Sequence, residues 1–188
     1  MTRSILLVGV GGQGIILTSK ILAKALINEG FDVKMSEVHG MAQRGGSVST
    51  QVRYGEKVFS PIIGRGKADI LVAFEEMEAM RYIEFLNPGG VLILNTHRIQ
   101  SAPISRGAFK YPDGIIDELK NKVNTVVINA SEEAKKIGNI RVQNIILLGK
   151  LTNFLNLKKA NWNEILKNNI KEKYVDINLK AFETGLNF

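Results

Sequence analysis

The sequence predicts an α/β fold: a three-layer, Rossmann-like sheet that is mostly parallel, with an inserted hairpin and a C-terminal helical layer. Three observations support this. A branched apolar run near the N-terminus passes directly into a glycine-rich turn and an amphipathic helix, strand-like and helix-like segments then alternate, and beyond Arg141 the apolar residues have helical spacing. The 188 residues contain no internal repeat and no break in composition, so residues 1–188 are expected to form a single domain.

The stretch Ile5–Gly14, ILLVGVGGQG, has the pattern of a strand, a tight turn and the start of a helix. Gly9, Gly11 and Gly14 form a GxGxxG motif, which lets the backbone approach a ligand closely and directs helical N–H groups toward an anion. The same glycines also permit a tight turn without any ligand. The motif alone therefore leaves both a dinucleotide site and a purely structural turn open.

A parallel β-α-β unit is predicted to include this turn. Apolar residues recur at helical spacing up to Gly30, which suits a helix C-terminus, and strand character resumes at Phe31–Val38. Glu37 ends this second strand about where a dinucleotide fold places a ribose-binding carboxylate. The unit is therefore compatible with an NAD-binding protein.

The next segment departs from a dinucleotide fold. The glycine-rich loop from His39 to Ser47 follows the carboxyl end of a strand, which is where ligands bind in open α/β sheets. A dinucleotide fold would continue into a helix, whereas Val48–Tyr54 alternates as a strand does. We expect this strand and a short return at Val58–Phe59 to form a hairpin inserted into the sheet.

The remaining segments continue the α/β alternation. The predicted elements are strands at 69–74, 91–94 and 125–129, an edge strand at 104–109, a turn at 86–90, and helices at 113–122, 131–135 and beyond 141. Glu75, Glu76 and Glu78 suit a helix N-terminus, so we interpret them as structural rather than catalytic. His97, at the end of a strand, has two interpretations, a residue that faces the cleft and a surface histidine, and we favour the surface histidine.

The composition excludes several kinds of site. With no cysteine, the chain forms no disulfide, has no thiolate nucleophile and cannot ligate an iron–sulfur cluster through cysteine. Its two histidines are far apart in sequence, so no metal site is expected. The net charge of +7 comes mostly from lysines of the second half, interleaved with asparagine, which does not favour nucleic-acid binding. Lacking a membrane-length apolar run and a signal-peptide pattern, the protein is expected to be cytoplasmic, without membrane contact.

The candidate binding residues lie in the two glycine-rich loops and at the end of the second strand, and no residue stands out as catalytic. Free backbone N–H groups and a guanidinium suit an anionic ligand. The alternative is that both loops only shape the turn and a subunit interface. The residues expected to line the cleft are Gly9, Gly11, Gly12, Gln13, Gly14, Glu37, His39, Gln43, Arg44, Gly45 and Gly46.

Several segments carry a resemblance to a known family. They are GVGGQGI (Gly9–Ile15), EVHGMAQRGGSV (Glu37–Val48), Pro61-Ile-Ile, ADILVAFEEMEAMRY (Ala68–Tyr82) and the closing NLKAFETG (Asn178–Gly185). Over nearly its whole length, the chain resembles the γ-type domain of the 2-oxoacid:ferredoxin/flavodoxin oxidoreductases. The EVHGMAQRGG segment points to the indolepyruvate branch of this family and to its β subunit.

The resemblance implies a subunit that is not active alone. Such enzymes decarboxylate a 2-oxoacid on thiamine diphosphate, pass electrons through iron–sulfur clusters to ferredoxin and transfer the acyl group to coenzyme A. The indolepyruvate type acts on aryl pyruvates. Thiamine diphosphate, Mg and the clusters are then expected in a larger, cysteine-containing catalytic subunit, within a heterodimer or heterotetramer. The chain agrees with this expectation, since it lacks cysteine and has no GDG motif upstream of Asn168-Asn169.

Two other classes of protein stay open on the sequence alone. A stand-alone NAD(P)-binding Rossmann oxidoreductase would use the GxGxxG turn and Glu37. A basic RNA-binding module would use the lysine-rich second half. The missing aromatic and Arg/Gly pattern argues against the second class, and the inserted strand argues against the first.

Overall fold

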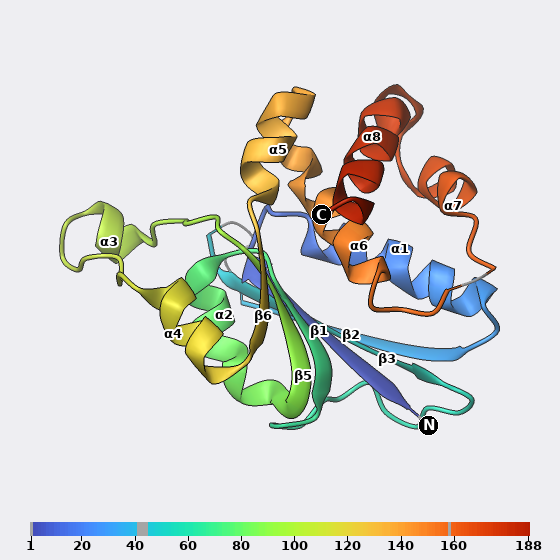
Figure 1. The fold of residues 1–188 in the computed structure, drawn as a ribbon, viewed down its shortest axis with the longest axis horizontal. Helices are drawn as coiled ribbons and strands as arrows, with labels where there is room; N and C mark the ends of the chain where they lie inside the picture. Colours follow the sequence, from blue (N-terminus) through green and yellow to red (C-terminus); the bar gives the residue numbers. More distant parts are fainter. Residues whose placement is uncertain (1, 41–44, 158) are drawn as a thin grey trace.

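Within the described residues, the structure is built on one six-stranded sheet. A computed structural model describes residues 2–40, 45–157 and 159–188. The strand order is β2-β3-β1-β4-β5-β6, and β3 runs against the other strands. The expected three-layer, mostly parallel α/β class is confirmed (Figure 1). The strands are β1 (Arg3–Val10), β2 (Asp32–His39), β3 (Ser47–Gly55), β4 (Ala68–Ala73), β5 (Leu86–Asn95) and β6 (Asn124–Ile128).

Helices cover both faces of the sheet. They are α1 (Ile15–Asn28), α2 (Glu76–Tyr82), α3 (Ala102–Ser105), α4 (Ile115–Lys122), α5 (Ala130–Ile137), α6 (Gln143–Thr152), α7 (Trp162–Asn169) and α8 (Val175–Leu186), with 3₁₀ turns η1 (Ile83–Phe85), η2 (Ile140–Val142) and η3 (Glu172–Tyr174). Helices α1, α6, α7 and α8 pack on one face, and α2 and α4 pack on the other (Figure 1). Among these described helices, none has the length and apolarity that a membrane span requires.

Strand β1 lies at the centre of the sheet and leads into the glycine turn. It is buried from Ser4 to Val10, as expected of a strand covered on both faces. The turn then needs backbone conformations that only glycine adopts at low energy: Gly12 has φ +104° and Gly14 has φ +82°. Gly14 is the N-cap of α1, and Gly30, with φ +94°, follows its C-terminus as the sequence predicts.

Strand β3 lies between β1 and β2 and is antiparallel to both. Its register with β1 runs from Arg3 opposite Tyr54 to Val10 opposite Ser47. The inserted hairpin is present, but β2 and β3 form it, and the predicted return strand at Val58–Phe59 is wrong. A strand of two residues offers few ladder hydrogen bonds, whereas β2 pairs with β3 from Val48 to Gly55. Strands β1 and β2 still run in the same direction, as predicted, although they are not neighbours.

Two further local predictions are wrong. The segment 86–90, predicted as a turn, is the first half of β5, and a register shift beside β4 accommodates it. The segment 104–109, predicted as an edge strand, instead begins in the last two residues of the short helix α3, whose first turn contains Pro103, and continues as a turn. Proline suits the first turn of a helix because the N–H it lacks would have no partner there. The other predicted strands and helices are present.

The C-terminal layer depends on a close contact between α6 and α8. Gly149 on α6 faces Gly185 on α8, and a Cβ added to either would lie within 2.3 Å of a carbonyl oxygen on the other helix. The two backbones therefore touch where these glycines meet. Gly185 belongs to the closing NLKAFETG motif, so packing explains at least this residue of the motif.

The variant Gly185→Ala is expected to lower the free energy of unfolding by about 1–3 kcal/mol, because its Cβ would lie 2.0 Å from the Ile146 carbonyl oxygen. Helix propensity alone would favour alanine by about 1 kcal/mol, so the two effects have opposite signs. Urea denaturation measures the difference. Glu183→Ala, at an exposed site on the same helix, is the control and should change stability by no more than about 0.5 kcal/mol. A Gly185→Ala variant that is as stable as the parent, or more so, would contradict the crowding.

Candidate functional site

The two glycine-rich loops meet at the carboxyl edge of the parallel strands. Strand β1 ends at Val10, and the chain turns through Gly11–Gly14 into α1. The loop between β2 and β3 returns beside this turn. There the Gly11 N–H donates to the Gly46 carbonyl (2.8 Å), and the Gly45 N–H donates to the Gly11 carbonyl (3.3 Å). A reciprocal pair of backbone hydrogen bonds therefore joins two loops that are far apart in the sequence.

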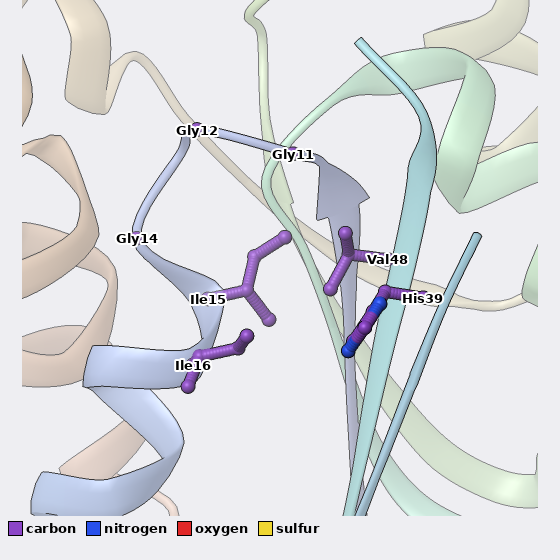
Figure 2. A pocket seen from close by; sticks show the side chains of 7 residues that line it. All are labelled: Gly11, Gly12, Gly14, Ile15, Ile16, His39 and Val48. Atoms are coloured by element: carbon purple, nitrogen blue, oxygen red, sulfur yellow. The ribbon is translucent and has the colours of Figure 1, made fainter. Parts of the chain in front are cut away.

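A pocket of about 390 Å³ opens between the glycine turn, α1 and the β2–β3 hairpin. Figure 2 shows Ile15 and Ile16 on α1 facing His39 and Val48 on the strands. No side chain caps the N-terminus of α1, and the first residues of this helix line the pocket, so uncapped N–H groups lie at this end of it. The pocket thus combines an apolar wall with a weakly positive end. Its other lining residues are Gly11, Gly12 and Gly14.

Gly9 and Gln13 support the turn from within and do not line this pocket. The buried Gln13 side chain accepts from the Val10 N–H through Oε1 (2.8 Å) and donates from Nε2 to the Phe74 carbonyl (2.8 Å). A Cβ on Gly9 would lie 2.8 Å from the Cβ of Phe74. Both residues therefore set the shape of the turn.

Two other predicted residues, Glu37 and His39, project from β2 toward α1. His39 lines the pocket, while the Glu37 carboxylate lies 3.8 Å from Lys20 Nζ on α1. Because β3 separates β2 from β1, Glu37 is two strand spacings, or about 10 Å, from β1. A dinucleotide fold places its ribose-binding carboxylate on the strand adjacent to β1. The predicted residues Gln43 and Arg44 lie outside the described residues.

A buried polar network underlies the same edge of the sheet. Asn95, at the end of β5, donates through Nδ2 to the Phe74 carbonyl (3.2 Å), which also accepts from the glycine turn. The same amide lies 3.3 Å from Ser131 Oγ and 3.1 Å from Gln143 Oε1. His97 Nδ1 lies 2.8 Å from Ser131 Oγ, and burial lowers the pKa of His97. The prediction of a surface histidine is wrong, because His97 is half-buried in this network.

Three carboxylates are buried at the N-terminus of α2, where the sequence placed them. Glu75 caps the helix by accepting from the Glu78 N–H (2.9 Å), and it also accepts from the Tyr111 hydroxyl. Glu76 accepts from Arg98 Nε (2.8 Å). Desolvation raises the pKa of both Glu76 and Glu78.

Glu78 also connects α2 to the second glycine loop. Its Oε2 accepts from the hydroxyl of Ser47, and its Oε1 lies 3.4 Å from Arg81 Nε. Because Ser47 directly follows Gly46, this buried carboxylate holds the residue next to the Gly11–Gly46 joint. No sequence pattern marks the pair, since a serine at the start of a strand does not indicate a partner 31 residues away.

The described residues do not provide a metal or cluster site. The chain has no cysteine, and within the described ranges no three His, Asp or Glu side chains gather in a way that could hold a metal ion. A [4Fe–4S] or [2Fe–2S] cluster normally requires four cysteine thiolates. The pocket offers backbone N–H groups and apolar side chains, which suit an organic ligand with an anionic group.

This fold and this cysteine-free site match one class of protein. A family model described as pyruvate ferredoxin/flavodoxin oxidoreductase matches residues 4–188, and the chain belongs to this family. Among its relatives is the indolepyruvate oxidoreductase subunit IorB of Archaeoglobus fulgidus, which is 42% identical over 100% of this chain and 95% of its own. IorB of Methanothermobacter thermautotrophicus is 40% identical, and the match covers 98% of this chain and 96% of its own. The resemblance inferred from the motifs is confirmed.

A solved structure agrees with the family assignment. The gamma subunit of a keto/oxoacid ferredoxin oxidoreductase from Geobacter sulfurreducens PCA superposes with a TM-score of 0.73. It is 27% identical, and the match covers 98% of this chain and 96% of that one. The chain is therefore a subunit of an oxidoreductase of this family rather than a stand-alone Rossmann dehydrogenase.

The variant Glu78→Gln is expected to change how stability depends on pH. Burial raises the folded-state pKa of Glu78 above its usual 4.5, so the folded state holds this proton to higher pH than the unfolded chain does. The stability that the proton contributes is complete below pH 4.5 and is lost as pH rises through the raised pKa. Glutamine keeps an acceptor for Ser47 but does not titrate, so the variant gains stability relative to the parent as pH rises.

Urea denaturation of parent and variant between about pH 4 and 8 measures this difference. Glu118→Gln, at an exposed position of α4, is the matched control and should show no such trend. Parallel stability curves for Glu78→Gln and the parent would contradict the raised pKa.

NAD(H) and NADP(H) are expected to leave the melting temperature unchanged at millimolar concentration. The physical reason is the position of β3, which keeps Glu37 away from the strand that carries the glycine turn. A ligand present at 100 times its Kd would stabilise the chain by about 2.7 kcal/mol, which differential scanning fluorimetry detects readily. A concentration-dependent rise in melting temperature would contradict the expectation.

Proposed function

We propose that this chain is the cluster-free subunit of a thiamine-diphosphate-dependent 2-oxoacid:ferredoxin oxidoreductase that converts indolepyruvate and other aryl pyruvates to acyl-CoA. The observation that carries the proposal is the joint between the two glycine loops. It holds Gly11 and Gly46 together beside an open pocket in a chain that cannot bind a cluster through cysteine. The IorB names of the relatives support indolepyruvate as the substrate.

The redox chemistry then belongs to a larger, cysteine-containing catalytic subunit. Oxidative decarboxylation of a 2-oxoacid to a thioester releases CO₂ and two electrons, so it needs an electron carrier as well as a group that stabilises the acyl carbanion. Thiamine diphosphate with Mg and the iron–sulfur clusters supply these functions in the partner, and ferredoxin receives the electrons from the complex. This chain contributes a binding wall and performs no electron transfer of its own.

The pocket supplies two properties that such a complex needs. The apolar side chains of Ile15, Ile16 and Val48 exclude water and suit an aryl group or the thiol arm of coenzyme A. The first turn of α1 and the glycine backbone favour a carboxylate or phosphate at the other end. Both the 2-oxoacid and coenzyme A combine an anionic group with a less polar part, so either ligand fits this chemistry.

The glycine turn places this wall on rigid elements. Gly11 is bonded to the second loop, and Gln13 ties the turn to the end of β4 through Phe74. Groups fixed in this way lose little entropy when a ligand binds. We therefore expect that blocking the pocket changes the reaction and leaves subunit assembly unaffected.

The variant Ile16→Trp tests this role in the complex reconstituted with the larger subunit. The added ring narrows the pocket, so kcat/KM for indolepyruvate, or for coenzyme A, is expected to fall at least about tenfold, measured as reduction of ferredoxin. Ile27→Trp on the same helix, where the side chain is 56% exposed, should leave the rate unchanged. Normal turnover by an assembled Ile16→Trp complex would remove the pocket from the mechanism. Absence of 2-oxoacid oxidation by the parent complex would refute the proposed function.

A further inference from the structure

A short loop at the opposite edge of the sheet presents two large apolar side chains to solvent. This segment, residues 56–63, follows β3 at the amino edge of the parallel strands, and we call it the Phe59 loop. Phe59 is 86% exposed and Ile62 is 57% exposed, whereas Val58 and Ile63 are only 4% and 3% exposed. The loop thus buries one pair of apolar side chains and displays another pair.

Hydrogen bonds hold the Phe59 loop on both sides of the exposed ring. The Val58 N–H donates to the Asp32 carboxylate (2.8 Å). Arg53 Nη1 donates to the carbonyls of Ser60 (2.9 Å) and Ile62 (3.3 Å). The exposed side chains are therefore attached to a backbone that is already ordered, so a partner would not have to pay for ordering it.

Cations flank the apolar pair. The Lys57 ammonium lies 5.1 Å from the centroid of the Phe59 ring. Lys67 lines a hollow of about 630 Å³ beside Ile62. Among the described residues neither lysine forms an ion pair. In the same hollow the Asp69 carboxylate already has two hydrogen-bond partners. It accepts from the Ser4 N–H (2.7 Å) and from the side-chain amide of Asn87 (3.0 Å).

We infer that the Phe59 loop is a docking surface for the larger catalytic subunit, whose matching surface has an apolar recess for Phe59 and Ile62 and carboxylates that face Lys57 and Lys67. Interface energy concentrates in aromatic anchors that become fully desolvated, and complementary charges at the rim favour the correct partner. The inference depends on the proposed function for the existence of that subunit, but it concerns a different edge of the sheet.

A second copy of this chain fits the Phe59 loop poorly. A symmetric contact would bring two copies of the same patch, each carrying Lys57 and Lys67, into one interface. Each chain also carries a net charge of +7. Like charges brought together at an interface oppose association, whereas an acidic surface on a different subunit would neutralise them.

The Phe59 loop and the pocket of about 390 Å³ lie at opposite edges of the sheet, so their variants should have different effects. Loss of a docking anchor raises the Kd between the subunits, and excess partner restores turnover. Loss of the pocket lowers turnover in complexes that have already assembled. This difference separates failure of the inference from failure of the proposed function.

The experiment measures the Kd between this chain and the purified larger subunit by biolayer interferometry. The double variant Phe59→Ser with Ile62→Ser is expected to weaken binding at least about tenfold, and Lys57→Glu with Lys67→Glu to weaken it and to reduce its sensitivity to salt. The matched control is Phe109→Ser with Ile27→Ser, which removes a Phe and an Ile that are 70% and 56% exposed at other places. The control should bind as the parent does.

Three results would overturn the inference alone. The first is an unchanged Kd for the Phe59 and Ile62 double variant, in a parent complex that oxidises 2-oxoacids. The second is an equal loss of affinity in the control, since exposed apolar area would then matter and its position would not. The third is self-association of the parent that the double variant abolishes, which would assign the Phe59 loop to a second copy. Absence of any parent complex would overturn the proposed partner as well.

Discussion

The antiparallel pairing of β3 with β1 is the interaction on which the rest of this structure depends. In a plain β-α-β unit the loop after β2 would lead into a second helix packed on the sheet. Here β3 occupies the place beside β1, with Ser47 opposite Val10. Gly45 and Gly46, which directly precede Ser47, therefore lie next to the glycine turn. The backbone bonds between Gly11 and Gly46 follow from this register. A slip of one residue would also turn Val52 and Tyr54 away from α1, so burial of the apolar face fixes the register.

The carboxyl edge of the sheet contains many buried polar groups, and several of them support the two glycine-rich loops. Glu78 holds Ser47 on one side of the joint, while Gln13 and Asn95 share the Phe74 carbonyl on the other. Buried polar groups are destabilising unless they are hydrogen-bonded, so a network of this kind specifies one arrangement of the turn. The pocket wall is thereby held by the core of the molecule rather than by the loops alone.

The two edges of the sheet differ in what they expose. At the carboxyl edge glycine backbone and apolar side chains line an open pocket. At the amino edge a tethered loop projects Phe59 outward beside Lys57. The proposed function calls for both kinds of surface, because a wall of a shared active site works only when the partner is held in a fixed position. The parallel sheet separates the two surfaces while connecting them rigidly.

The sequence by itself determined the strand, glycine turn and helix at the N-terminus, the α/β class, the family and the exclusion of cysteine-bound clusters. These features are local or compositional, and a chain need not be folded to reveal them. Only the tertiary structure decided where β3 lies, that Glu78 meets Ser47, that His97 is half-buried, and that Gly11 rather than Gly9 lines the pocket. Each of these depends on contacts between residues far apart in the chain, which local patterns do not encode. The errors at 58–59, 86–90 and 104–109 have the same origin, since short apolar runs take the conformation that their long-range neighbours permit.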